Sequence, residues 1–188
     1  TAVMENFFAA LQTAAASPTD TASRQLLLTQ ASTLGERFNS IYSQLAEQNG
    51  YINQQLSSMV QQVNSLAASV AQYNQAIVNA SASGASPNDL LDQRDEAVRE
   101  LSELIGVTVV EQDGSYNLFI GNGQPLVVGG SAAQLSAVPS ADDPSRYALL
   151  LTQNGHFTID VTSSITGGQI GGLLRYGIPD FKMEKDIL

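Results

Sequence analysis

Cysteine is absent from this 188-residue sequence, and histidine occurs once. Without cysteine the protein can form no disulfide, no thiolate metal site and no thiol nucleophile. Charge is scarce as well, at 14% of residues, and it is unbalanced, with 8 basic against 18 acidic side chains. The resulting net charge of −10 disfavours nucleic acid and anionic membranes as partners, because both require a basic surface.

Long apolar runs and a secretory signal are also missing, so the sequence indicates neither a membrane span nor a cleaved leader. The first residue, Thr1, suggests a piece of a longer protein whose targeting information lies elsewhere. Hydrophobic residues nevertheless make up 43% of the sequence, more than a disordered tail carries. A folded protein of one or two domains is therefore expected.

Helical periodicity dominates the first part of the sequence. Apolar residues at helical spacing predict a short amphipathic helix over residues 3–15, which Ser17 and Pro18 interrupt. Asp20 then lies near the start of a second helix, where a carboxylate favours the positive helix end.

The second helix is predicted to be very long, from about residue 20 to residue 79. Asn49-Gly50 is its weak point, because this dipeptide often ends a helix, yet the seven-residue phase continues across it and favours one unbroken helix. Two series in sevens mark the a and d positions of a heptad seam. They are Tyr42, Asn49, Leu56, Val63, Val70 and Ile77, and Leu45, Ile52, Met59, Leu66 and Tyr73.

No charged residue occurs between Glu47 and Asp89. One interpretation is a solvated face that is polar without charge. The other is a face that packs against further copies or subunits, where a buried unpaired charge would be costly but an amide can adapt.

The rest of the sequence has a different character. Ser86 as N-cap and Pro87 at the first helical position predict another helix, which Gly106 ends. From there to residue 162 about six short strands alternate with turns, of which Asp113-Gly114 and Asn154-Gly155 are hairpin signals. The glycines of "ITGGQIGGLLRY" favour a tight crossing into a returning helix.

The predicted fold class is therefore α+β, a long-helix bundle or coiled-coil domain with an inserted antiparallel β domain. The expected domain boundaries are residues 1–105 for the helical domain, with a return segment at 165–176, and residues 106–164 for the β domain.

No credible catalytic, cofactor or metal site emerges. His156 and Asp160 lie about 13 Å apart along one strand, too far for a dyad. Asp92, Glu96 and Glu100 lie along one face of the predicted helix. A solvated acidic surface, whose charge a pair between Asp95 and Arg99 partly offsets, is favoured there over an acid/base pair. "GNGQPL" lacks the third glycine and the helix of a dinucleotide fingerprint.

Two blocks of sequence are specific enough to indicate a family. "LLDQRD" runs into "DGSYNLFIGNGQPLV", with "SPTDTASRQLLLTQASTLGERFNSIYSQL" before it and "ITGGQIGGLLRY" after it. Over about residues 1–176 the sequence resembles the bacterial flagellar hook-associated protein 1 family, found at the hook–filament junction. Flagellins share the long-helix design more loosely.

The resemblance implies an axial structural subunit that is not an enzyme and needs no cofactor. It implies export by the flagellar type III apparatus to an extracellular position in the flagellum. It also implies contacts with the hook protein, a second junction protein and further copies of itself. The segments that family members use for polymerisation are missing, so a monomeric, non-assembling fragment is expected. "GIPDFKMEKDIL", residues 177–188, departs from the family pattern and is expected to be an atypical tail, either foreign to the protein or the product of a frameshift.

Eight residues are predicted to carry packing or assembly: Leu45, Asn49, Ile52, Leu56, Met59, Val63, Leu66 and Val70. Asn49 is expected to fix register at its a position. Two alternatives remain open. One is a secreted coiled-coil stalk or adhesin with a β head, and the other is a glycan hydrolase that uses Asp92 or Glu96.

Overall fold

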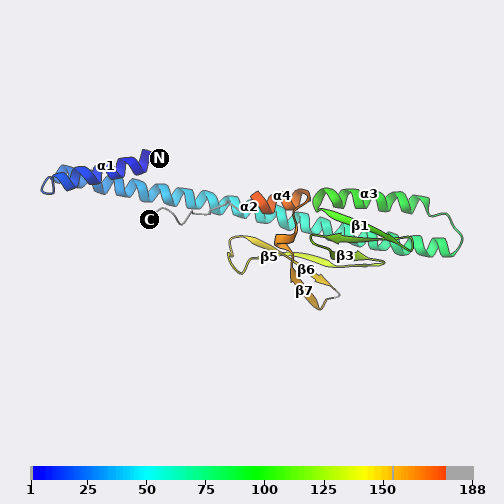
Figure 1. Cartoon of the computed structure of the whole chain (residues 1–188). Helices are drawn as coiled ribbons and strands as arrows, with labels where there is room; N and C mark the ends of the chain where they lie inside the picture. The colour runs from blue at the N-terminus through cyan, green and yellow to red at the C-terminus, as the bar shows by residue number, and fades with distance from the viewer. Residues whose placement is uncertain (1, 154, 177–188) are drawn as a thin grey trace. The chain divides into compact units, whose positions relative to one another are not determined.

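The structure is a computed structural model that describes residues 2–153 and 155–176 (Figure 1). The segment 177–188, which the sequence sets apart, lies outside the described residues. Helices and an antiparallel strand region make up the fold, which confirms the α+β class. The helices are α1 (Ala2–Ala16), α2 (Thr21–Ala82), α3 (Asn88–Leu104) and α4 (Gly168–Tyr176), with a 3-10 turn η1 (Thr162–Ser164).

Helix α2 is one continuous helix of 62 residues. It passes through Asn49 and Gly50 without a break, as the preserved heptad phase predicts. No helix in the described residues is both long and apolar enough to cross a membrane.

The helix starts show where local chemistry was predicted well and where it was not. Asp20 caps α2, because its carboxylate accepts hydrogen bonds from the backbone N–H groups of Ala22, at 3.3 Å, and Ser23, at 3.0 Å. The predicted cap of α3 was wrong. Pro87, with φ −87° and ψ 34°, occupies the N-cap position without a side-chain hydrogen bond. Helix α3 therefore begins one residue later than expected, and Ser86 lies too far upstream to cap it.

Seven strands form two antiparallel sheets in the described part of the protein. One sheet has the order β1-β2-β3-β4 and the other β5-β6-β7. The Asp113-Gly114 turn joins β1 to β2 with φ values of 51° and 77°, the conformation that a type I′ hairpin requires. The strands are β1 (Val107–Gln112), β2 (Ser115–Ile120), β3 (Gln124–Val128), β4 (Ser131–Ala132), β5 (Gln134–Pro139), β6 (Tyr147–Gln153) and β7 (Phe157–Asp160).

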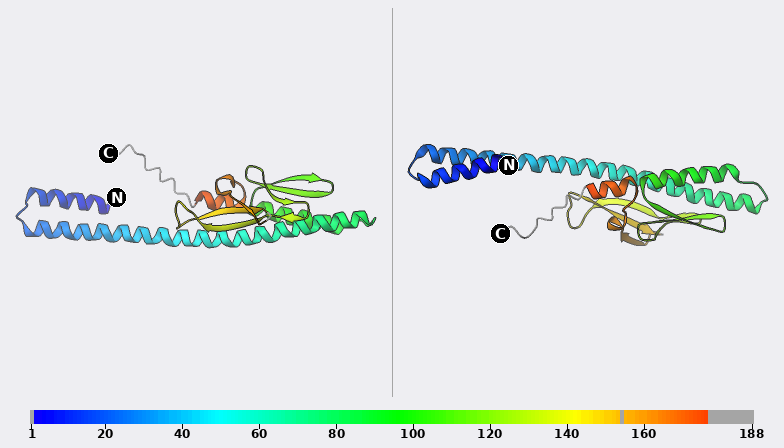
Figure 2. Two further views of the ribbon diagram at one scale, coloured as in Figure 1. Left: turned by 90° about the horizontal axis from the view of Figure 1, so that it is seen from below. Right: turned by 45° about the horizontal axis from the view of Figure 1, so that its top comes forward.

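The hydrophobic core lies where the second half of α2, α3, the two sheets and α4 meet. Figures 1 and 2 show α3 alongside this half of α2 with the strands beside both helices. The buried stripe of α2 follows the a column and the column four residues after it, instead of a and d. It consists of Leu56, Val60, Val63, Ala67, Val70, Asn74 and Ile77.

The d residues of the predicted seam lie at the edge of this stripe. Met59, Leu66 and Tyr73 are half-buried and pack against the core from its side. The core therefore uses a wide face of α2, as expected for a helix covered by several elements and not by a single partner helix.

By its contacts the described part of the protein divides between Gln48 and Asn49 into two compact units. In the first unit α1 and the beginning of α2 form a helical hairpin (Figure 2). The second unit holds the rest. The boundary expected at residues 105/106 differs from this division, because the strands use α2 and α3 as the other half of their core.

The backbone crosses itself closely where it leaves the helices for the strands and where it returns. A Cβ atom on Gly106 would lie 3.1 Å from the Cα atom of Gly167, and one on Gly168 would lie 2.7 Å from the backbone of Leu104 and Ile105. Only glycine fits such a contact without a shift of the backbone. Gly167 and Gly168 belong to the glycines that the sequence assigns to a tight crossing, whereas Gly106 was predicted only to end a helix.

Candidate interaction surfaces

The eight predicted packing residues fall into three environments. Leu56, Val63 and Val70 are buried in the core of the second unit. Ile52, Met59 and Leu66 are half-buried. Asn49 is half-buried too, and its side-chain amide lies 3.4 Å from the Ser145 hydroxyl. Leu45 is 42% exposed.

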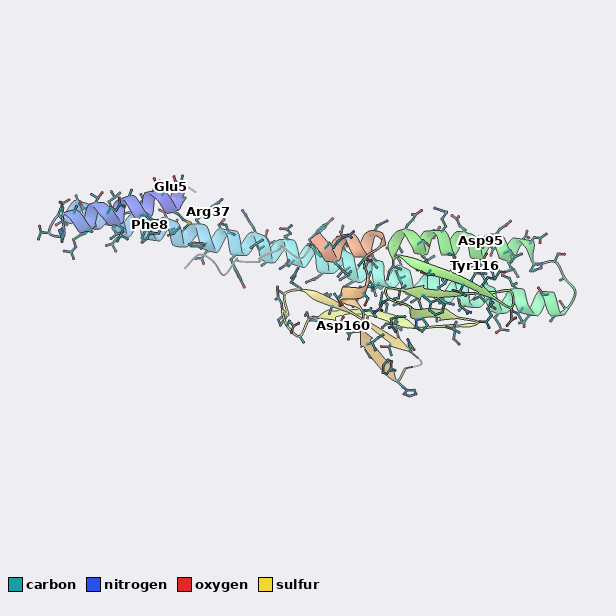
Figure 3. All side chains as sticks on the ribbon, in the orientation of Figure 1. Glu5, Phe8, Arg37, Asp95, Tyr116 and Asp160 are labelled. Atoms are coloured by element: carbon teal, nitrogen blue, oxygen red, sulfur yellow. The ribbon has the colours of Figure 1, made fainter. Side chains whose placement is uncertain are left out.

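The first unit leaves most of its large hydrophobic side chains in solvent. Ala10 is its one fully buried hydrophobic residue among those described, and Phe7 and Phe8 contact each other edge to face, with ring centroids 5.6 Å apart. Figure 3 shows side chains projecting from both helices of the hairpin, Phe8 among them. The exposed set is Met4, Phe8, Leu11, Leu26, Leu28, Phe38, Ile41, Tyr42 and Leu45, called the hairpin apolar surface below.

An exposed apolar surface of this kind is typical of a surface that another protein or segment covers. A helical hairpin with a nearly empty core gains little from its own packing, because most apolar area stays in water. The arrangement can bind other helices.

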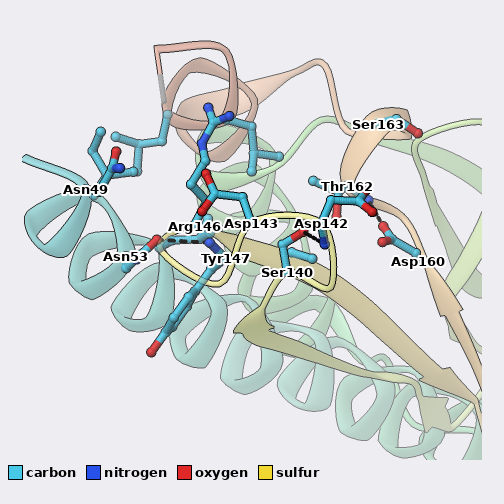
Figure 4. Close-up of a pocket in the computed structure, with 15 residues that line it drawn as sticks. Asn49, Asn53, Ser140, Asp142, Asp143, Arg146, Tyr147, Asp160, Thr162 and Ser163 are labelled. Atoms are coloured by element: carbon cyan, nitrogen blue, oxygen red, sulfur yellow. Dashed lines mark hydrogen bonds between the residues drawn. The ribbon is translucent and has the colours of Figure 1, made fainter. Parts of the chain in front are cut away.

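The second unit contains a groove with a volume of about 440 Å³ (Figure 4). Ile52 and Leu56 of α2 and Leu173 and Leu174 of α4 supply its apolar side. Carboxylates of the β5–β6 loop and the end of β7 supply its polar side, and they are Asp142, Asp143 and Asp160, with Arg146 beside them.

Two of these carboxylates, Asp143 and Asp160, accept hydrogen bonds from neighbouring groups. The Ser145 hydroxyl and the Ser145 backbone N–H donate to Asp143 and lower the pKa of its carboxyl group. The backbone N–H of Thr162 donates to Asp160 at 2.8 Å. A general acid needs a raised pKa, so the lowered pKa of Asp143 does not suit that residue to the role.

The acidic ladder of α3 gives the same result. Arg99 donates from Nε to Glu96 at 2.9 Å and from Nη1 to Glu103 at 2.6 Å. The Arg99 hydrogen bond lowers the pKa of Glu96, whereas a glycosidase acid requires a raised one. The partners of Arg99 are therefore Glu96 and Glu103, and not Asp95 as expected.

No metal centre is visible in the described residues, since no group of three or more potential ligands comes together there. His156 lies exposed in the turn between β6 and β7, and Asp160 lies at the far end of β7. The structure does not bring them together.

The residues that sequence reasoning missed are polar and buried. Arg94 is 2% exposed and Asn74 is 1% exposed, and Arg94 Nη1 donates to Asn74 Oδ1 at 3.2 Å and to the carbonyl of Gly114 at 2.7 Å. Asn53 and Asn64 face the strands from the same helix. Asn53 and Asn74 share one heptad position with Val60 and Ala67, which was the available signal.

Comparison with known proteins identifies the family. Residues 1–185 match the family model of the flagellar hook-associated protein FlgK helical domain. This match continues past Gly177, so it does not set the last segment apart as the sequence analysis did.

Two relatives cover nearly the whole chain. The chain is 38% identical to flagellar hook-associated protein 1 of Salmonella typhimurium, over 98% of this chain and 34% of that protein. It is 36% identical to the Escherichia coli protein of the same name, over 98% of this chain and 35% of that protein. The chain thus spans about a third of the length of the relatives it matches.

A solved structure agrees. The flagellar hook junction protein FlgK from Burkholderia pseudomallei superposes with a TM-score of 0.80 at 39% identity, over 93% of this chain and 32% of that one. The match includes both the long helix and the strand region. The chain therefore belongs to the flagellar hook-associated protein FlgK family, and it corresponds to the helical domain.

Proposed function

We propose that this chain is part of an axial structural subunit that joins the hook of the bacterial flagellum to its filament. The observation that carries the proposal is the hairpin apolar surface, which leaves nine large hydrophobic side chains exposed around one buried alanine. A subunit held in a tube by its neighbours needs such a surface, because burying each of these side chains stabilises the assembly by roughly 1.5–3 kcal/mol. The family supports the same role.

The subunit acts without catalysis or cofactor. The carboxylates of Glu96 and Asp143 accept hydrogen bonds that lower their pKa values, and the described residues hold no cluster of metal ligands. The proposed partners are the hook protein, a second junction protein and further copies of the same subunit. Its proposed location is the extracellular flagellum, reached through the flagellar type III apparatus.

The predicted packing residues divide between two roles in this proposal. Leu45, on the hairpin apolar surface, contacts neighbouring helices in the assembly. Leu56, Val63 and Val70 act inside the subunit, because the protein's own strands already cover them. The half-buried residues Asn49, Ile52, Met59 and Leu66 lie at the border between the two.

The test replaces part of the hairpin apolar surface in the full-length protein of a motile strain. Phe38→Gln combined with Ile41→Gln removes two exposed apolar side chains of α2. We expect filament protein to be released into the medium and motility to be lost, while hooks remain visible by electron microscopy. Secretion of the variant itself, measured by immunoblot of the medium, should persist.

The matched control is Ser40→Gln with Ser43→Gln, which adds the same residue at exposed positions of the same helix stretch without loss of apolar area. Filaments of normal length are expected for this control. Normal filaments and motility in the Phe38/Ile41 variant would count against the proposal, as would the same defect in both variants.

A further inference from the structure

Three asparagines of α2 bind the backbone of the strands through their side-chain amides. Asn53 donates to the carbonyl of Ser145 at 2.8 Å and accepts from the N–H of Tyr147 at 3.1 Å. Asn64 donates to the carbonyl of Leu135 and accepts from the N–H of the same residue, both at 2.8 Å.

Asn74 makes the same kind of contact with more partners. Its amide nitrogen donates to the carbonyls of Tyr116 and Gly129, each at 2.8 Å, and its oxygen accepts from the N–H of Tyr116 at 2.9 Å. An amide offers an acceptor oxygen and two N–H donors, so it can complement a backbone C=O and N–H pair as a neighbouring strand would.

The three asparagines serve different sheets. Asn74 contacts β2 and the turn between β3 and β4, which belong to the sheet β1-β2-β3-β4. Asn64 contacts the start of β5, and Asn53 contacts the start of β6, in the sheet β5-β6-β7. Among the residues that the structure describes, no strand of one sheet pairs with a strand of the other.

The apolar contacts of these sheets with α2 do not by themselves fix a position along the helix. Hydrophobic burial is non-directional, and the face of α2 toward the core offers similar small and branched residues turn after turn, namely Val60, Val63, Ala67 and Val70. A shift of one helical turn, about 5.4 Å, would keep much of the buried area but would break every amide contact to the shifted sheet. The buried N–H and C=O groups left unpaired would make that shift costly.

We infer that Asn53, Asn64 and Asn74 set the axial register of the two sheets on α2, independently for each sheet. Asn74 holds the first sheet, and Asn64 with Asn53 holds the second. Through them the strands and the part of α2 from Asn49 onward behave as one body. These three asparagines also explain part of the stretch of α2 that lacks charged residues. A charged side chain cannot supply both a donor and an acceptor to the backbone, whereas an amide can. This inference does not depend on the proposed role at the junction.

The absence of native cysteine allows a direct test by spin labelling. Gln72→Cys places a label at an exposed position of α2, Glu111→Cys places one on β1, and Phe157→Cys places one on β7. Pulsed electron–electron double resonance then measures the distance between two labels. The 72/111 distance reports the position of the first sheet on α2, and the 72/157 distance reports the position of the second. Narrow distance distributions are expected for both pairs in the otherwise unchanged protein.

The variants are chosen to act on one sheet each. Asn74→Leu should broaden the 72/111 distribution or shift it by about 5 Å, one helical turn, and leave the 72/157 distribution as it was. Asn64→Leu should do the reverse. Gln62→Leu, which adds the same residue at an exposed position of α2, is the control and should change neither distribution.

Two results would overturn the inference. One is that neither asparagine variant changes its distribution while circular dichroism shows a folded protein. The other is that each variant changes both distributions to the same extent, which indicates general loss of stability. If Asn74→Leu does not fold, Asn74→Asp replaces it. Aspartate still accepts from the Tyr116 N–H and from Arg94 Nη1, and it loses the bonds that Asn74 donates to the carbonyls of Tyr116 and Gly129. The same selective change of the 72/111 distance distribution is required of it.

Discussion

The guanidinium carbon of Arg94 lies 3.5 Å from the centroid of the Tyr116 ring, over the ring face. Arg94 comes from α3 and Tyr116 from β2, so this contact joins a helix to the first β-hairpin. No carboxylate lies within ion-pair distance of Arg94 among the described residues, and its buried Nε has no hydrogen-bond partner. The ring face, the Gly114 carbonyl and Asn74 therefore compensate the buried charge in place of an acid.

Replacing Arg94 tests this arrangement. Arg94→Ala should lower the free energy of unfolding by about 3 kcal/mol or more, because it leaves a cavity and unpaired acceptors at Gly114 and Asn74. Arg94→Met keeps most of the volume and removes the buried charge, so its cost should be at least about 1 kcal/mol smaller. Urea denaturation followed by circular dichroism measures both. Equal losses in the two variants would contradict the assignment of the cost to packing.

Leu56 and Leu45 occupy related sites on the predicted seam but differ in burial. Leu56→Ala should lower the free energy of unfolding by about 2–5 kcal/mol, because Leu56 is 1% exposed in the core. Leu45→Ala should change it by less than about 0.5 kcal/mol, because its side chain is 42% exposed. Thermal melts of the two variants decide the matter. A large decrease in stability for Leu45→Ala would show that Leu45 is buried within the subunit itself and is not free to contact a neighbour.

Gly168 and Gly172 lie in the same helix and provide a matched pair. Gly168→Ala should destabilise the protein by about 2 kcal/mol or more, since Gly168 has φ +70° and its new Cβ would lie 2.7 Å from the backbone of Leu104. A Cβ atom on Gly172, within α4, would have no neighbour within 4 Å. Gly172→Ala should therefore be neutral or stabilise the protein by up to about 1 kcal/mol. Chemical denaturation of both variants is the measurement. Similar values for the two would argue against the tight crossing.

The cap of α2 predicts a dependence on pH. Hydrogen bonds from the Ser23 hydroxyl, the Ser23 N–H and the Ala22 N–H lower the pKa of Asp20 from its ordinary value of 3.8. The stabilisation is therefore fully present above the unfolded pKa of about 3.9 and is lost as the pH falls through the folded pKa. Amide exchange at Ala22 and Ser23, measured by NMR between about pH 6 and pH 3, should show protection that falls with acid beyond the intrinsic exchange rate.

Asp20→Asn is the control for this dependence, because asparagine also caps helices but does not titrate in this range. Its amides should keep the same protection, after correction for intrinsic exchange, at both ends of the pH range. An identical acid-induced loss in Asp20→Asn would show that another group controls the first turn of α2.

Local chemistry made much of the fold predictable. The helix spans, the unbroken passage of α2 through Gly50, and the Asp113-Gly114 hairpin all follow from periodicity, capping and turn preferences near each residue. The glycine crossing was predictable for the same reason, since a close backbone approach explains Gly167, Gly168 and Gly171, although not Gly172.

The face of α2 that is buried was not predictable in the same way. A heptad count favours large apolar residues, so it selected Met59, Leu66 and Tyr73 and passed over Ala67 and Asn74. Ala67 and Asn74 are the buried ones because the strands approach α2 closely there, and Asn74 bonds with their backbone. Which residues of α2 are buried depends on the strands that pack against the helix. A single sequence does not show directly which segments come into contact.

The assembly role of the eight predicted residues stays a prediction. Of these eight, only Leu45 belongs to the hairpin apolar surface, whereas Phe38 and Ile41, which are exposed on the same helix, were not among them. The sequence could not separate them from Leu56 or Val63, because both sets follow helical periodicity and differ only in whether the β strands reach them.

The contact between Gly106 and Gly167 brings together the two points where the backbone departs toward the strands and comes back. Extra residues inserted between Gly155 and His156, which are exposed in the turn between β6 and β7, would leave this junction and the contact of Arg94 with Gly114 untouched. An epitope tag or a fluorophore placed there should therefore be tolerated. Deleting the strands altogether is a different matter, because α2 and α3 would then be left with half of their shared interior open to water.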